Sequence, residues 1–383
     1  MPPVAAIVLV LAILSWGHAW VGARTLGTLD LSPPLLWAGW AAVIGSAVAV
    51  PLGLLSRFFT RGRTSEVLGW IGMVALGVFS LVFTSVVARD LGWFIARLLG
   101  LLPADMATRA HLLGQTSAAV LAMSLVAAIF GLYSARRVAS VKEVEVPLAD
   151  LPDALDGFTI VQLSDVHVGP TIRRGTVEGI VDAVNALGAD MVAITGDLVD
   201  GSVPDLSHHT APLGRLEARH GTFFVTGNHE YYAGAESWVA ELRRLGLRVL
   251  LNEHVVLDHE GHPVVIAGVT DYWAGRMLPA HKSDPVGALA GAPDSRVKVL
   301  LAHQPKSAHA AVDAGYHLQL SGHTHGGQMI PWNLFVPLQQ PFVAGLHRLR
   351  DLWVYTSRGT GYWGPPLRVG APSEITRLRL VRA

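Results

Sequence analysis

The apolar residues of this 383-residue chain follow two different patterns. The first 140 residues hold four long stretches without a charged side chain, at Val4–Val21, Leu35–Leu55, Val67–Val87 and Thr116–Tyr133. About 20 apolar residues in a helix span the hydrocarbon core of a bilayer. The pattern therefore predicts a transmembrane region of about four helices in residues 1–140, with the third helix continuing past Arg89 as an amphipathic tail.

Two other interpretations of these stretches are less consistent with the sequence. A cleaved signal peptide would carry a basic start, but Met1-Pro2-Pro3 has no Lys or Arg and three more stretches follow. Buried helices of a soluble domain seldom stay apolar on every side for so long. The mean hydropathy of +0.41, with only 15% charged residues, also favours a membrane region.

Residues 141–383 carry shorter apolar runs, which are typical of buried strands separated by amphipathic helices. Five runs precede polar motifs: Phe158–Leu163, Met191–Thr195, Thr222–Thr226, Val297–Ala302 and His317–Leu320. Helices are predicted at Arg173–Leu187, Leu206–Ala218 and Ala235–Leu245, and further strands at Val141–Leu148 (an edge strand), His254–Leu257, Val264–Val269, Leu352–Tyr355 and Ile375–Leu380. This alternation predicts a layered α/β domain over residues 141–383.

Metal-binding residue types follow each of the five runs. They are Asp165, His167, Asp197, Asn228, His303, His323 and His325. Ligands of open α/β sheets collect beyond the carboxyl ends of the strands. Residues two apart in an extended chain point the same way, so each Asp-x-His or His-x-His pair is expected to face one ion. Oxygen and nitrogen donors in a chain without cysteine suit Mn, Fe or Zn, and also allow Mg. The sequence predicts a site for two divalent ions.

Two ions about 3.5–4 Å apart favour in-line displacement at phosphorus, because they neutralise charge and activate water. A carboxylate such as Asp197 is a natural bridge between two cations. His229 adjoins Asn228 and is the candidate acid for the leaving group. Asp197 and His229 are therefore the candidate catalytic residues.

The ordered motifs resemble those of the calcineurin-like metallophosphoesterase family. They read Asp165-x-His167, Gly196-Asp197-x-x-Asp200, Gly227-Asn228-His229-Glu230, Ala302-His303 and Gly322-His323-x-His325. The late segments Pro366-Leu367-Arg368 and Glu374-Ile375-Thr376 are similar to those of a bacterial, membrane-anchored subgroup. The resemblance implies a four-layer α/β/β/α sandwich after the transmembrane region.

The resemblance also implies the ligand sets. One metal would be held by Asp165, His167, Asp197 and His325, and the other by Asp197, Asn228, His303 and His323. A hydroxide that bridges the metals would attack phosphorus. Asp200 is followed by Gly201, where the protein-phosphatase branch has an arginine, so a protein phosphatase is disfavoured and Asp200 is expected to support a ligand or cap the loop. Arg368 could replace that cation or form a salt bridge at a surface or sheet edge.

The expected function is a membrane-anchored phosphohydrolase acting on a phosphoester or pyrophosphate, with a bias towards lipid-linked substrates. A cyclic-nucleotide or other soluble phosphodiesterase is the alternative. A non-catalytic metal-binding scaffold with a sensor or transport region is a third reading. We expect no paired intramembrane charges of the kind that mark a transport path.

A net charge of +0 indicates no nucleic-acid partner, and the oligomeric state stays open. Four spans would put both termini on one side of the membrane. We expect a multi-pass protein of the cell membrane with a cytoplasmic catalytic domain, because the side of the termini would carry more basic residues: Arg57, Arg61, Arg63, Arg136, Arg137 and Lys142 against Arg24, Arg89, Arg97 and Arg109.

Overall fold

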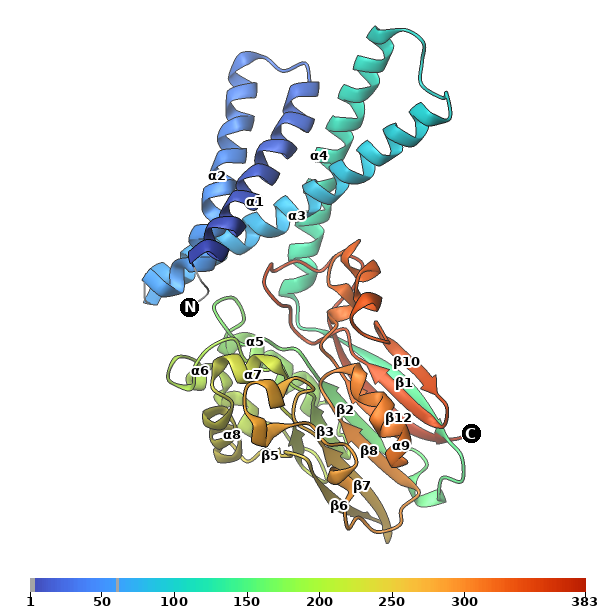
Figure 1. Cartoon of the computed structure of the whole chain (residues 1–383). Helices are drawn as coiled ribbons and strands as arrows, with labels where there is room; N and C mark the ends of the chain where they lie inside the picture. Colours follow the sequence, from blue (N-terminus) through green and yellow to red (C-terminus); the bar gives the residue numbers. More distant parts are fainter. Residues whose placement is uncertain (1–3, 60–61) are drawn as a thin grey trace. The chain divides into compact units, whose positions relative to one another are not determined.

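The chain divides into two compact units in the computed structural model, which describes residues 4–59 and 62–383 (Figure 1). Arg61, part of the charge comparison above, lies outside these residues. The helical unit comprises Met1–Tyr133 together with Gly364–Val369. The sandwich unit comprises Ser134–Trp363 and Gly370–Ala383.

The helical unit is built from four long helices. They are α1 (Val4–Thr25), α2 (Pro33–Phe59), α3 (Gly62–Leu98) and α4 (Met106–Arg136). Each is long and apolar enough to cross a membrane, as the sequence predicts. At one crossing of α2 and α3 the backbones touch, because a Cβ added to Gly53 would lie 2.6 Å from the Cα of Gly72. Small residues at such crossings let membrane helices pack closely.

A charged network joins three of these helices. Asp90 accepts hydrogen bonds from Arg24 Nε and from Arg89 Nη2, each at 2.7 Å. Arg89 also donates to Ser117 Oγ and to the main-chain oxygen of Arg24. The expectation that the membrane region lacks paired charges is therefore wrong. The partners lie more than 60 residues apart on different helices, so their spacing in the sequence does not reveal the pairing.

The segment Gly364–Val369 packs within the helical unit although it comes late in the chain. The main-chain nitrogen of Arg368 donates to the oxygen of Gly131 at 3.0 Å. Gly77 of α3 leaves room for Leu367, which a larger residue would displace. Arg368 is only 1% exposed, so the surface position considered for it is wrong.

The sandwich unit contains two mixed sheets of six strands. In spatial order, the first holds β1 (Ser140–Leu148), β12 (Glu374–Arg382), β2 (Thr159–Leu163), β3 (Met191–Ile194), β4 (Thr222–Phe224) and β5 (Arg248–Val249). The second holds β10 (Gly345–Leu349), β11 (Leu352–Thr356), β9 (Leu318–Ser321), β8 (Val297–Leu301), β7 (His262–Gly268) and β6 (Glu253–His259). β1 lies at a sheet edge, as predicted. The sequence did not reveal β5, which has two residues, or β10, whose residues are mostly half-buried.

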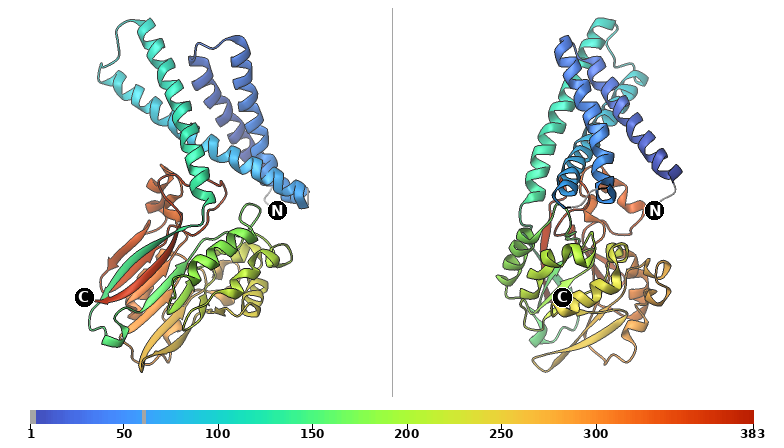
Figure 2. Two further views of the ribbon diagram at one scale, coloured as in Figure 1. Left: turned by 180° about the vertical axis from the view of Figure 1, so that it is seen from behind. Right: turned by 90° about the vertical axis from the view of Figure 1, so that its left-hand side faces the viewer.

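Five helices of this unit are α5 (Arg174–Asn185), α6 (Val203–Thr210), α7 (Asn228–Ala233), α8 (Ala235–Arg244) and α9 (Ala308–Ala314). Apolar side chains of both sheets, such as Ile160 and Leu301, form one buried core between them. A second core joins α5 and α8 to the outer face of the first sheet, and a third joins α9 to the second sheet. The predicted four-layer sandwich is confirmed (Figure 2).

One predicted helix is shorter than expected. The sequence pattern extends from Leu206 to Ala218, whereas α6 ends at Thr210 and a 3₁₀ segment, Ala211–Arg215, follows. Pro212 lacks a backbone N–H, which an α-helix would need at that position.

The directions of the strands place several chain connections at one edge of the unit. We call the edge where β2, β3, β4, β8 and β9 end the carboxyl edge. The two sheets meet there, since His303, after β8, bonds to the oxygen of Thr195, after β3. β12 is antiparallel to β2, and β1 is parallel to β12. The chain therefore enters β1 from α4 at this same carboxyl edge.

Candidate metal centre

The carboxyl edge brings together the side chains that the sequence singled out. Asp165 and His167 follow β2, Asp197 follows β3, and Asn228 is the first residue of α7 after β4. His303 follows β8, and the pair His323 and His325 follows β9. Their donor atoms form two clusters.

The first cluster contains Asp165, His167 and His325, whose ligand atoms all lie within 4.8 Å of one another. The Nε2 atoms of the two histidines are 3.1 Å apart. His325 Nε2 lies 3.4 Å from Asp165 Oδ1. All three residues are buried, so the cluster offers two imidazoles and a carboxylate shielded from bulk water.

The second cluster contains Asp197, His303 and His323. Asp197 Oδ2 lies 3.0 Å from His303 Nε2, and His323 Nδ1 lies 3.2 Å from the same Nε2. Asn228 adjoins this cluster, because the next backbone N–H, that of His229, donates to Asp197 Oδ1 at 2.9 Å.

The donor atoms at this edge fit a divalent metal ion. Asn228 Oδ1 is buried and has no hydrogen-bond partner. A buried carbonyl oxygen without a partner costs about 1–3 kcal/mol, and coordination of a cation removes that cost. The neighbouring donors are carboxylate oxygens and imidazole nitrogens, which hard and borderline divalent ions prefer. The residues therefore suit Mn, Fe or Zn.

Hydrogen bonds fix the orientation of the imidazoles. His303 Nδ1 donates to the main-chain oxygen of Thr195 at 2.8 Å, which leaves Nε2 facing Asp197. His167 Nδ1 bonds to Asp200 Oδ1 at 2.8 Å, so its Nε2 faces the first cluster. Such partners on the far nitrogen hold metal-binding histidines in place. Asp200 thus supports a candidate ligand, in line with its expected role.

Asp200 holds His229 as well. His229 Nδ1 lies 2.7 Å from Asp200 Oδ1, and its Nε2 lies 3.9 Å from Asp197 Oδ2. Asp200 therefore leaves the Nε2 atom of His229 free to face Asp197 of the second cluster. This orientation is the one that a proton donor to a leaving group needs.

Glu230 has a role that the sequence reading did not assign. Its carboxylate accepts backbone N–H groups from Asp197 at 3.0 Å, Leu198 at 2.8 Å and Gly227 at 2.6 Å. Burial and the charge of Asp197 raise the pKa of Glu230 to about 7. The signal was present in the sequence, since Glu230 stands three residues after Gly227, the N-cap of α7, in the position of a capping box.

The backbone of five candidate ligands is left-handed, not extended. The φ angles are 52° at Asp165, 55° at His167, 52° at Asp197, 70° at His323 and 51° at His325. The prediction that Asp165 and His167 share a direction because the chain is extended is therefore wrong in its reason, although the side chains do converge. For His323 and His325 the predicted shared ion is itself wrong, because the two side chains belong to different clusters. Residues with a Cβ adopt this conformation at a cost of roughly 1–2 kcal/mol each, and such strain gathers at functional sites.

Buried ion pairs set the charges of the metal-free cluster. Burial opposes a charge on His303, but the carboxylate of Asp197 outweighs it and raises the pKa of His303 to about 10. Asp200 outweighs burial in the same way and raises the pKa of His167 to about 9. Burial and the charge of His303 lower the pKa of His323 to about 3. Two of the candidate ligands therefore carry protons that a metal must displace.

These pKa values predict opposite pH trends with and without metal. His167 and His303 have raised folded-state pKa values, so their contribution to stability is complete below about pH 6.5 and declines as the pH rises towards 9. We expect the Tm of EDTA-treated protein to fall from pH 6.5 to pH 9. The stabilisation added by Mn²⁺ should grow over the same range, because binding releases protons. Thermal unfolding at matched pH checks this, and parallel curves would contradict it.

Two exposed aromatic residues flank His229. The ring centroid of Tyr232 lies 5.4 Å from that of His229, and that of Trp363 lies 5.9 Å away. Tyr232 is 69% exposed and Trp363 is 56% exposed. Trp363 is held by two hydrogen bonds between its backbone and the side chain of Gln328. Two solvent-exposed aromatic rings therefore lie beside His229.

The two facing sheets, with clustered acidic and imidazole donors at their carboxyl edge, define a metallophosphoesterase domain. The family model described as Calcineurin-like phosphoesterase matches residues 158–327. This chain belongs to the calcineurin-like metallophosphoesterase family.

Curated relatives of this chain include membrane proteins. It is 40% identical over 272 residues to the transmembrane protein with metallophosphoesterase domain of Danio rerio, a match that covers 69% of this chain and 62% of that relative. It is 36% identical over 262 residues to an uncharacterized metallophosphoesterase of Campylobacter jejuni, covering 67% and 68%. Among solved structures, a 5'-nucleotidase precursor from Thermus thermophilus aligns with a TM-score of 0.37 and 18% identity, covering 53% of this chain and 49% of that one.

Proposed function

We propose that this protein is a dinuclear metal-dependent phosphohydrolase that cleaves a phosphoester or pyrophosphate bond. The convergence of seven donor side chains at one edge, including a buried Asn228 oxygen without a hydrogen bond, is the observation that carries the proposal. Asp165, His167 and His325 would hold one ion, and Asn228, His303 and His323 the other, with Asp197 between them. When bound, such ions supply Lewis acidity towards phosphoryl oxygens and make a water molecule acidic near neutral pH.

The protein's own residues perform the remaining tasks. Asp197 carries negative charge between the two clusters, and Glu230 fixes the backbone on which that carboxylate stands. His229, oriented by Asp200, donates the proton of its Nε2 atom to the leaving oxygen. The exposed rings of Tyr232 and Trp363 bind the apolar tail of a substrate that extends further than an aryl ester, beside that proton donor.

We propose a lipid-linked substrate because of these two rings and the chain that follows them. Trp363 is joined directly to Gly364–Val369, the segment that packs among the apolar helices. Exposed aromatic rings followed in the chain by a segment that packs among apolar helices favour an apolar substrate tail, and substrates confined to a bilayer reach a tethered site at high local concentration.

Activity profiling tests the proposal. Full-length protein in lipid nanodiscs with Mn²⁺ should hydrolyse aryl phosphate esters and a lipid phosphate. Trp363→Ala should lower kcat/KM for the lipid phosphate about tenfold, as expected for about 1.4 kcal/mol of lost binding. It should leave a soluble aryl phosphate nearly unchanged. Equal loss for both, or faster turnover of cyclic nucleotides than of lipid phosphates, would favour a soluble substrate. No turnover with any divalent ion would refute the enzymatic proposal.

We also propose that the catalytic unit faces the cytoplasm of a cell-membrane protein. The support is the larger number of basic residues on the side that carries both termini. A C-terminal green fluorescent protein should fluoresce, and a C-terminal alkaline phosphatase should stay inactive; the reverse pattern would place the unit outside.

A further inference from the structure

The segment Ile330–Leu338, at the carboxyl edge, exposes an unusual amount of apolar surface. Its large apolar residues Ile330, Trp332, Leu334, Phe335 and Leu338 are between 42% and 81% exposed. Outside this segment, no nine-residue stretch of the sandwich unit, all of which the structure describes, has more than two such residues. Single exposed apolar residues are ordinary, but a continuous group of them marks an interaction surface.

The segment is anchored at both ends, so its exposed side chains are held outwards. Met329 forms a backbone bridge with Gly370 on one side. On the other side, the side chain of Gln340 accepts from the main-chain nitrogen of Lys306 and donates to Gln304. Two short 3₁₀ turns, Trp332–Leu334 and Val336–Leu338, shape the part between these anchors.

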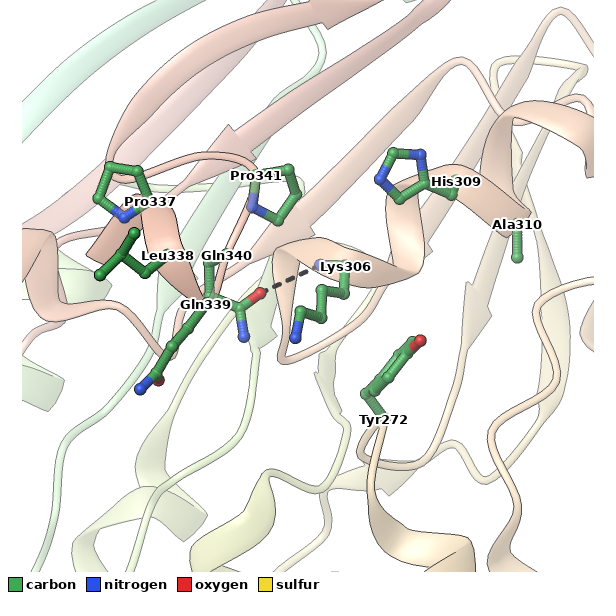
Figure 3. A pocket seen from close by; sticks show the side chains of 9 residues that line it. All are labelled: Tyr272, Lys306, His309, Ala310, Pro337, Leu338, Gln339, Gln340 and Pro341. Carbon is green, nitrogen blue, oxygen red and sulfur yellow. Dashed lines mark hydrogen bonds between the residues drawn. The ribbon is translucent and has the colours of Figure 1, made fainter. Parts of the chain in front are cut away.

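A lysine borders the segment, and an arginine lies over the same aromatic ring as that lysine. Pro337 and Leu338 line an open cavity of about 410 Å³ together with Lys306 and His309 (Figure 3). The Lys306 ammonium lies 5.3 Å from the centroid of the Trp273 ring, and the guanidinium of Arg276 lies 3.7 Å from it. Apolar side chains next to basic ones are the usual composition of a surface that rests at the level of lipid headgroups.

The short link between α4 and β1 limits how far the carboxyl edge can lie from the end of α4. α4, which is apolar enough to span a bilayer, ends at Arg136, and β1 begins at Ser140. Four Cα–Cα steps span at most about 14 Å. β1 starts at the carboxyl edge, the same edge that carries Ile330–Leu338, since the segment follows His325 after β9.

We propose that Ile330–Leu338 is an interfacial membrane-binding segment whose apolar side chains enter the headgroup and upper acyl region of a lipid bilayer, with Lys306 facing anionic headgroups. This role is independent of the proposed hydrolytic activity. The segment fixes the edge that carries the candidate metal centre against the lipid surface.

Site-specific fluorescence tests this inference. Because the chain has no cysteine, Phe335→Cys or Leu338→Cys gives one unique attachment point for an environment-sensitive nitrobenzoxadiazole dye. Full-length protein would be reconstituted at one chain per nanodisc of phosphatidylcholine and phosphatidylglycerol. Asp294→Cys is the matched control, because Asp294 is exposed and precedes β8 at the opposite edge. A Tm equal to that of the parent protein shows that each variant is folded.

We expect blue-shifted emission at positions 335 and 338, and quenching by nitroxide-bearing lipids several-fold stronger than at position 294. Removing phosphatidylglycerol should weaken the quenching if Lys306 faces anionic lipid. Water-like emission without lipid quenching at both positions would overturn the proposal. A blue shift that appears only in nanodiscs with two chains, again without lipid quenching, would assign the surface to a second copy and would equally overturn it.

Discussion

Asp197→Asn should reduce kcat for an aryl phosphate by roughly 10³-fold or more at saturating Mn²⁺. The neutral amide removes the negative charge that we propose is shared by both ions, and several kcal/mol of transition-state stabilisation correspond to about that factor. The amide would also place an N–H group either against His303 Nε2, 3.0 Å from Asp197 Oδ2, or against the His229 N–H. Elemental analysis should show less bound metal per chain.

Asp182→Asn on α5 is the matched control, because Asp182 is exposed and makes only a 3.7 Å surface pair with Arg215. It should keep the parent activity and metal content. Normal metal content and normal kcat in Asp197→Asn would show that this carboxylate does not join the two sites, and the proposed ligand sets would fail.

His229→Gln should lower kcat by about 10²–10⁴-fold for substrates with poor leaving groups. Glutamine cannot deliver a proton, whereas His229 is positioned for it by the 2.7 Å bond to Asp200. The loss should shrink for nitrophenyl esters, whose leaving oxygen needs no proton. The measurement is the dependence of log kcat on the pKa of the leaving group, which should be steeper in the variant.

Metal content should stay unchanged in His229→Gln, since His229 is outside the proposed ligand sets. His208→Gln, at an exposed position on α6, is the control for loss of an imidazole. If alkyl and aryl esters lose activity equally, His229 acts in binding the phosphoryl group and not in protonating the leaving oxygen.

The sequence predicts this fold well because its signals are local. Each of the strands β2, β3, β4, β8 and β9 is a short apolar run ended by a polar motif, and parallel strands must bring such ends to one edge. The apolar stripe of α5 was equally evident from the sequence, and its residues Val177, Ile180 and Val181 face the sheet. Short or half-exposed strands such as β5 and β10 carry no comparable pattern.

The sequence predicted which side chains converge at the candidate site. It did not predict the backbone geometry that brings them together. Positive φ angles at Asp165 and Asp197 cannot be read from residues that normally avoid them. The support that Glu230 gives to the backbone of Asp197 depends on a contact across 33 positions. In the helical unit, the bond between Arg24 and Asp90 likewise depends on tertiary packing and not on spacing.

The path of Gly364–Val369 has a practical consequence for anyone who wishes to isolate the hydrolase portion. A gene truncated before β1 would still encode these six residues, but Gly77 and Gly131, which accommodate Leu367 and Val369, would be gone. The resulting fragment would expose the apolar side chains of Leu367 and Val369 to water and would be prone to precipitate. Biochemistry on this polypeptide is better started from the intact form in detergent or nanodiscs than from a soluble fragment.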